Sequence, residues 1–355
     1  MSNTSAGVCG LKNRFFIFFS GIGVFVLIFL FSEDFTAGFS AGLSNCVKVV
    51  IPSLFPFLAA SALTGSGELP PLIKKFAEPV TQHFFRLPAD CLPAIILSQL
   101  GGYLSGASAA SSLYSSGIIS RAQAQKLTLF CINSGVGFSV NAVGNALLGS
   151  RTAGKILLLS LCLSSVVAGF FIRFIPDRGE KENKIIRENI NFSSALVGSV
   201  YSASYAMLSC CGFVCFFSGI SSVISSLINN HPFNLAAVCL LEVTSGCAAA
   251  AGRVSLPVIA AVCAFGGICV HMQIFSLTKT LGIKIPVFYL FRFLHSALAY
   301  AFCRIILLFH PIEEQVMISV SRNIELWSYS APAAISLMFL CVLLILELDN
   351  NKKIC

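Results

Sequence analysis

Long apolar runs recur along the whole chain, and short polar segments separate them. About 20 consecutive apolar residues are enough for an α-helix to cross a hydrocarbon core of roughly 30 Å. The pattern therefore predicts eight membrane-spanning helices, over residues 14–31, 46–64, 126–149, 154–175, 195–226, 254–276, 286–309 and 330–348. Two further apolar segments, 92–118 and 233–251, are interrupted by small residues, and we expect each to form a re-entrant helical hairpin.

The composition strengthens this interpretation. Hydrophobic residues make up 56% of the 355 residues, charged residues make up only 11%, and the mean hydropathy is +0.86. Soluble domains carry roughly 25% charged residues. The first apolar run ends in Ser32, Glu33 and Asp34, which do not form a small-residue cleavage site, so we expect a retained helix rather than a signal peptide. The predicted class is an all-α polytopic membrane protein.

The basic residues indicate the orientation of the chain. The formal net charge is +8, but most of the 23 Lys and Arg residues lie in short loops rather than in a patch that could dock a nucleic acid. Cytoplasmic loops of membrane proteins are enriched in Lys and Arg. With a cytoplasmic N-terminus and two re-entrant hairpins, sixteen of the 23 fall inside. We therefore expect a protein of the bacterial cytoplasmic membrane whose two termini are both cytoplasmic.

This topology contains two units of opposite orientation, each consisting of a helix, a hairpin and two more helices. The expected organisation is an N-terminal helix and outer loop (1–45), a first repeat (46–175), a cytoplasmic linker (176–194), a second, inverted repeat (195–309), and an outer loop with a C-terminal helix (310–355). Many secondary transporters are built from inverted repeats, and their substrate sites lie where helices are interrupted near the bilayer centre.

Glycine and polar residues interrupt the apolar pattern at four matched places: 99–106, 133–137, 242–246 and 266–267, the last followed by two polar side chains. A half-helix that begins inside the membrane offers free N–H groups that suit a carboxylate. Close helix packing is the alternative role of any single glycine here. The candidate substrate-binding residues are Gly102, Ser105, Asn133, Ser134, Thr244, Ser245, His271 and Gln273.

Glu242 is the acidic residue placed deepest in an apolar segment. A carboxylate at the bilayer centre costs about 2.5–3.5 kcal/mol on insertion scales, so such residues are rare and usually functional. Because burial disfavours the charged form, we expect Glu242 to carry a proton or to bind a coupling cation. A neutral, hydrogen-bonded carboxyl is the structural alternative. Arg292 and His295 share a helix face, and we expect both Arg292 and Arg304 to extend toward the lipid headgroups.

The remaining chemistry is sparse. Most of the fifteen cysteines are scattered inside apolar runs without the spacing of a zinc site or a disulfide scaffold, so they are interpreted as packing residues. A metal site or other cofactor is not expected. The sequence has no nucleophile–base pair or phosphate-binding loop, so an enzyme is not expected either.

Several segments resemble the sporulation integral membrane proteins of the YlbJ type, within the group that carries nucleoside-recognition (Gate) domains. The segments are 51–57 (Ile-Pro-Ser-Leu-Phe-Pro-Phe), 102–103 with 106–107, 117–121, 242–246 (Glu-Val-Thr-Ser-Gly), and 265–273. The chain departs from the family at Leu104, where a proline is usual, and at Ser134-Gly135-Val136. The resemblance implies a membrane protein of spore-forming bacteria that passes dipicolinate, a small dicarboxylate, across the outer forespore membrane.

The sequence thus predicts a transporter or facilitator for a small carboxylate, with dipicolinate as the expected substrate. A nucleoside or nucleobase transporter, suggested by the group name, and a non-transporting scaffold or sensor of sporulation remain as alternatives. The expected partners are a small anionic solute and the lipid bilayer, and self-association into a homo-oligomer is left open.

Overall fold

The computed structural model describes residues 3–176, 191–228 and 231–312, and every regular element within them is helical. The α-helices are α1 (Asn3–Leu30), α2 (Ser32–Asn45), α3 (Ile51–Thr64), α4 (Pro71–Val80), α5 (Leu92–Gly101), α6 (Tyr103–Ser115), α7 (Arg121–Phe130), α8 (Arg151–Phe171), α9 (Phe192–Leu227), α10 (His231–Leu241), α11 (Val243–Ala250), α12 (Leu256–Phe265), α13 (Gly267–Leu277) and α14 (Ile285–Phe309). The π-helical segments are η1 (Cys46–Val50), η2 (Thr81–Phe85) and η4 (Gly137–Leu147), and the 3-10 turns are η3 (Ala89–Cys91), η5 (Ile172–Phe174) and η6 (Lys279–Leu281). The predicted all-helical class is confirmed. The predicted span 330–348 and most of the linker 176–194 lie outside the described residues.

Five helical stretches of the described chain are long and apolar enough to cross a membrane. They are Ser32–Thr64, Arg151–Phe174, Phe192–Leu227, Leu256–Leu277 and Ile285–Phe309, and each contains or overlaps a predicted span. The apolar parts of α1 and of α10 are shorter, and the predicted span 126–149 is divided into α7 and η4. These helices support a polytopic membrane protein.

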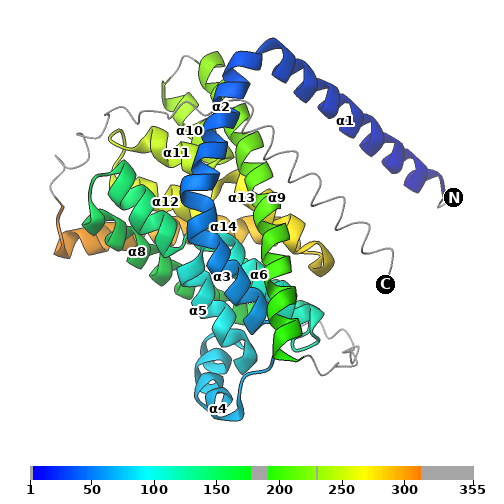
Figure 1. The fold of residues 1–355 in the computed structure, drawn as a ribbon, viewed down its shortest axis with the longest axis vertical. Helices are drawn as coiled ribbons and strands as arrows, with labels where there is room; N and C mark the ends of the chain where they lie inside the picture. Colours follow the sequence, from blue (N-terminus) through cyan, green and yellow to red (C-terminus); the bar gives the residue numbers. More distant parts are fainter. Residues whose placement is uncertain (1–2, 177–190, 229–230, 313–355) are drawn as a thin grey trace. The chain divides into compact units, whose positions relative to one another are not determined.

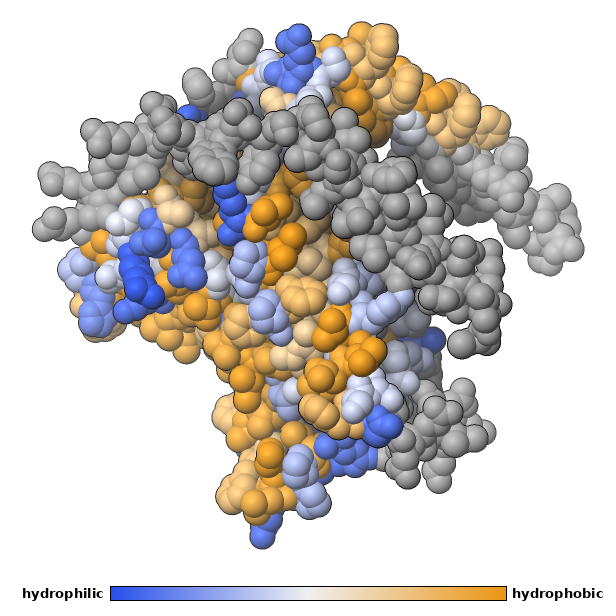
Figure 2. Space-filling view, in the orientation of Figure 1, coloured by the Kyte–Doolittle hydropathy of each residue, from blue (hydrophilic) through white to orange (hydrophobic). Residues whose placement is uncertain are grey.

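The surface is apolar over a large area (Figure 2). Large side chains such as Phe29, Phe293 and Leu308 are exposed on the helices rather than packed inside. In water, an apolar surface of this extent would be unfavourable, whereas hydrocarbon tails solvate it. The exposed surface therefore agrees with a membrane-embedded chain, as the five long helices do.

The segment 32–45, predicted to be an outer loop, is instead helix α2, and it continues through η1 into α3 beside α9 (Figure 1). Glu33 and Asp34 lie in its first turn, where acidic side chains favour a helix. Gly38 packs directly on the α9 backbone near Ser218, so the two helices approach closely. The small and polar residues of this segment therefore allow a close helix–helix contact and do not form a loop.

All four predicted interruptions are present. Gly102 separates α5 from α6, and Glu242 separates α10 from α11, and each pair of short helices packs together. Non-helical residues 131–135 separate α7 from the helical segment that continues into η4, and Gly266, with a φ of +87°, separates α12 from α13. Backbone groups at these breaks lack helical partners, so each break needs other residues to satisfy it.

Helix α4 connects α3 to the first hairpin and has one exposed apolar face, formed by Leu72, Ile73 and Phe76. Beside this face, the Lys74 ammonium lies 3.0 Å from the Glu68 carboxylate and 3.1 Å from that of Asp90. Asp90 also accepts a hydrogen bond of 2.9 Å from the backbone N–H of Leu69. The connection is therefore a packed, ordered element.

Candidate functional site

Residues at or shortly after the four interruptions line one small cavity of about 40 Å³. Its wall combines residues of both predicted repeats with residues of two uninterrupted helices. The residues at the breaks or just beyond them are Gly102, Tyr103, Gly135, Phe138, Glu242, Val243, Thr244, Val270 and Gln273. The uninterrupted helices contribute Val49, Val50, Ser53 and Leu54 from η1 and α3, and Cys210 and Val214 from α9. A water molecule needs roughly 10–15 Å³ of such space, so the cavity holds a few waters or one small cation.

The first interruption depends on a glycine. Gly102 has a φ of +96° and a ψ of −178°, a backbone conformation that residues with a side chain rarely adopt. A Cβ atom at Gly102 would also lie 2.5 Å from Cδ2 of Leu54. The second interruption packs against the first, since a Cβ atom at Gly135 would lie 2.5 Å from the backbone nitrogen of Gly102. The first two breaks are therefore in backbone contact.

This contact gives a direct prediction. We expect Gly102→Ala to destabilise the protein by about 2 kcal/mol or more, because a positive φ with an extended ψ costs about 1–3 kcal/mol and the new methyl group meets Leu54. Thermal unfolding in detergent measures the effect. Gly212→Ala is the matched control, because a Cβ atom there meets nothing within 4 Å. Equal melting temperatures for the two variants would contradict the strained turn.

Glu242 forms the third interruption and caps α11. One carboxyl oxygen accepts a hydrogen bond of 2.8 Å from the backbone N–H of Thr244, and the other accepts one of 2.7 Å from that of Ser245. The side chain is 1% exposed. The helix N-terminus, where an external carboxylate would bind, is thus occupied by the protein's own carboxyl group.

The fourth interruption joins the third. A Cβ atom at Gly267 would lie 3.1 Å from the carbonyl oxygen of Leu241 and 3.3 Å from the nitrogen of Glu242. Gln273, one turn and a half into α13, accepts a hydrogen bond from the Cys210 thiol of α9 at 3.4 Å and lines the cavity. The third and fourth breaks are therefore in close contact, as the first and second are.

Of the nine predicted site residues, Gly102, Glu242, Thr244 and Gln273 line the cavity, and Ser245 supplies an N–H group to Glu242. Asn133 instead donates a hydrogen bond of 2.8 Å to the Gln99 side chain. The amide group of Gln99 in turn donates to Ser165 at 3.1 Å, and the Ser165 hydroxyl donates to the carbonyl of Phe130 at 2.9 Å. This chain of hydrogen bonds satisfies the end of α7.

The other three predicted residues also lie outside the cavity wall. The Ser134 hydroxyl bonds to that of Ser139 at 2.7 Å, and the buried Ser105 hydroxyl has no hydrogen-bond partner within the described chain. The imidazole of His271 lies 2.8 Å from the carbonyl oxygen of Phe265 and packs edge-on against Phe288. In this conformation His271 therefore satisfies the end of α12 rather than facing the cavity.

The expectation that Arg292 extends toward the headgroups is wrong. The residue is 0% exposed, and its guanidinium donates 2.8 Å hydrogen bonds to the carbonyls of Leu129 and Ile132. It also lies 3.5 Å from the carbonyl of Ala264 and from Nδ1 of the buried His295. The carbonyls of Leu129 and Ala264 lie in the last turns of α7 and α12, and that of Ile132 lies just after α7. Helix dipoles are negative at these C-terminal ends, so one buried cation stabilises both helix ends. Arg304, by contrast, is exposed.

Several residues that line the cavity were not predicted as site residues. Tyr103 lines the cavity, and its hydroxyl donates a hydrogen bond of 2.7 Å to the carbonyl of Cys263, which links the first hairpin to α12. Because Tyr103 directly follows Gly102 at a predicted break, the sequence could have indicated Tyr103 as a site residue. Ser53 and Cys210 lie on uninterrupted helices, and no local sequence feature marks them. Among the described residues there is no cluster of three or more potential metal ligands. Comparisons with protein-family models, curated proteins and solved structures give no match.

Proposed function

We propose that this protein is a membrane transporter or facilitator for a small carboxylate, with dipicolinate as the substrate that the family resemblance implies. The observation that carries the proposal is the convergence of four helix breaks on one buried cavity beside the Glu242 carboxyl. Interrupted helices at membrane depth are costly unless they surround a site or a polar path. A purely structural bundle has no need of four of them at one place.

The proposed topology has eight spans and two re-entrant hairpins in an inverted repeat. Helices α5 and α10 have 10 and 11 residues, or about 15 Å each at 1.5 Å per residue, which is half of a hydrocarbon core. Each pairs with a second short helix that returns from the break. The apolar face of α4 with Lys74 and Lys75 fits a helix lying on the cytoplasmic membrane surface.

A small cavity implies that the described conformation is closed. A dicarboxylate occupies far more than about 40 Å³, so the substrate requires one hairpin to move away from the other. The same step has to release the N–H groups of Thr244 and Ser245 from Glu242. A proton or a small cation on Glu242 weakens these bonds and frees the helix N-terminus for the substrate carboxylate. This exchange couples Glu242 to transport.

Two measurements test the proposal. Spores of a deletion strain should contain little dipicolinate while the mother cells still make it, and proteoliposomes should take up labelled dipicolinate. Uptake of a labelled nucleoside instead of dipicolinate would show that the substrate is a nucleoside rather than a carboxylate. Normal spore dipicolinate together with no uptake of either solute would favour the scaffold or sensor and end the transport proposal.

A further inference from the structure

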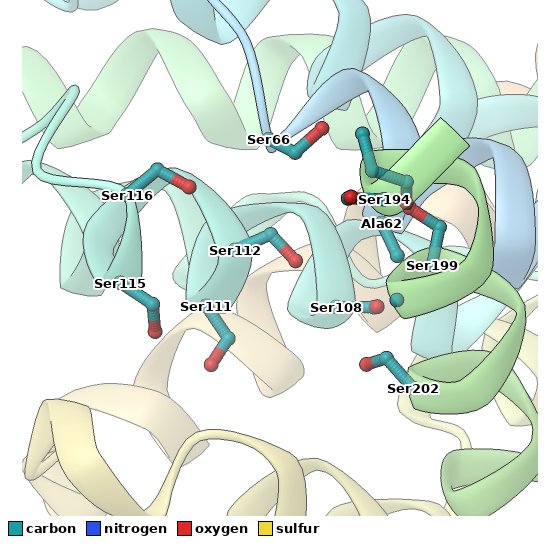
Figure 3. A pocket seen from close by; sticks show the side chains of 12 residues that line it. Ala62, Ser66, Ser108, Ser111, Ser112, Ser115, Ser116, Ser194, Ser199 and Ser202 are labelled. Atoms are coloured by element: carbon teal, nitrogen blue, oxygen red, sulfur yellow. The ribbon is translucent and has the colours of Figure 1, made fainter. Parts of the chain in front are cut away.

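A second, larger pocket of about 330 Å³ lies between α3, α6 and α9, and nine of the twelve residues that line it are serines (Figure 3). Ser108 and Ser112 lie on one face of α6, and Ser202 of α9 faces Ser108 across the pocket. The lining contains no acidic or basic side chain. A volume of about 300 Å³ or more is sufficient for a small organic molecule.

The same three helices also form one side of the central cavity. Cavity and pocket are lined on α3 by Leu54 and Ala62, and on α9 by Cys210 and Ser202, respectively. Eight residues separate the members of each pair, which corresponds to about 12 Å along a helix. The pocket is therefore displaced from the cavity along these helices, toward the C-terminal end of α3 and the N-terminal end of α9.

Two buried hydroxyl groups lie between cavity-lining and pocket-lining residues along α3 and α6, and neither of them lines the cavity or the pocket in this conformation. Ser61 of α3 and Ser105 of α6 are both 0% exposed, and their hydroxyl oxygens have no hydrogen-bond partner within the described chain. Ser105 is spaced by three and seven residues from Ser108 and Ser112, so it continues the same helix face. A serine in a helix usually satisfies its hydroxyl on its own backbone, so two neighbouring buried hydroxyls without a partner within the described chain are unusual.

We propose that the serine-lined pocket is a vestibule that binds a small, oxygen-rich anion and passes it by Ser105 and Ser61 to the central cavity. This inference rests on the proposed transport function and adds a second site and a route to it. Hydroxyl groups donate hydrogen bonds to carboxylate oxygens, and the N-terminal end of α9, which supplies Ser194 to the lining, adds a partial positive charge. Because the lining has no basic side chain, the pocket binds the anion weakly and releases it toward the central cavity.

The position of the pocket fits access from the cytoplasm. Helix α9 has 36 residues, about 54 Å in length, which exceeds a hydrocarbon core of roughly 30 Å. Its first three turns, which line the pocket, can therefore lie at the level of the headgroups. They follow the linker that the charge pattern assigns to the cytoplasm.

Thiol labelling tests the route independently of the substrate. In inside-out vesicles, Ser105→Cys should react with an anionic, water-soluble methanethiosulfonate at least about ten times faster than Ser218→Cys. Both residues are buried in the described conformation, at 0% and 5% exposed, so the contrast measures the solvent access that each thiol gains when the proposed route opens. Ser218 is the matched control: its buried hydroxyl also lacks a partner, but it packs against Gly42 of α2, away from the pocket. Peptide mapping separates the new thiol from the native cysteines. Equal labelling rates would overturn the route.

Transport gives the second test. Ser202→Trp should reduce uptake of labelled dipicolinate at least about tenfold, because an indole side chain fills much of the pocket. Ser204→Trp should leave uptake unchanged, since Ser204 is exposed on another face of α9 and does not line the pocket. Equal uptake by both variants would overturn the vestibule. If the wild-type protein moves no dipicolinate, the proposed substrate fails, and the labelling contrast at Ser105 still decides whether the route exists.

Discussion

Replacing Glu242 with asparagine should reduce dipicolinate uptake at least about tenfold, a barrier increase of about 1.4 kcal/mol or more, whereas Glu242→Asp should keep most of it. Aspartate and asparagine both cap helix N-termini well, so each should preserve the bonds to the N–H groups of Thr244 and Ser245. The two variants differ chiefly in the ionisable carboxyl group. Their comparison therefore separates the chemistry of the group from its role as a cap.

The measurement combines uptake into proteoliposomes with thermal unfolding of the same preparations. Melting temperatures of Glu242→Asp and Glu242→Asn should agree within the effect of about 1 kcal/mol that a changed cap produces. Full uptake by the asparagine variant would mean that Glu242 is only a cap and that transport, if present, is not coupled through this residue. Loss of uptake in both variants with intact stability would point to the length of the side chain.

The largest effect on stability is expected at Arg292. Arg292→Met removes the donors from the carbonyls of Leu129 and Ile132, and each buried carbonyl left unsatisfied costs about 1–3 kcal/mol. A loss of about 3 kcal/mol should lower the melting temperature by on the order of 5 °C in a chain of this size. Arg292→Lys should be intermediate, because one ammonium group cannot reproduce the fork of a guanidinium.

Arg304→Met is the matched control for this experiment. Arg304 lies on the same helix but is exposed, so its removal should change the melting temperature little. A buried charge also carries a desolvation cost, and a methionine that packs well could offset part of the loss. Equal melting temperatures for Arg292→Met and Arg304→Met would show that this offset is complete and that the two helix ends do not depend on the guanidinium.

The helix breaks were predictable because their signal is local. Glycine and polar residues inside an apolar run mark an interruption wherever the run folds, and Gly102, Glu242 and Gly266 all lie at predicted breaks. The hydropathy and charge patterns also led us to expect that these breaks lie close together, but only the tertiary structure could show that they do. The wall residues Ser53 and Cys210 carry no such local signal.

The environment of a charged residue was the harder property to predict. Hydropathy does not distinguish an arginine that reaches the headgroups from one that is buried, because both lie in an apolar helix. Arg292 is buried because α7 and α12 both end beside it, and their free carbonyls replace water. Likewise, Asn133 has the chemistry of a substrate ligand, but the neighbouring Gln99 takes up its amide group. These outcomes depend on residues far apart in the sequence.

In the proposed transport cycle, the connection at α4 would constrain how the first hairpin moves. Lys74 forms an ion pair with Asp90, which lies two residues before α5, so this ion pair links α4 to the start of the α5–α6 pair. In the proposed orientation, α4 rests on the inner leaflet with Leu72 and Phe76 among the lipid chains. Displacement of the hairpin would then drag α4 across the leaflet, so the thickness and lateral pressure of the surrounding lipid would set part of the resistance to opening.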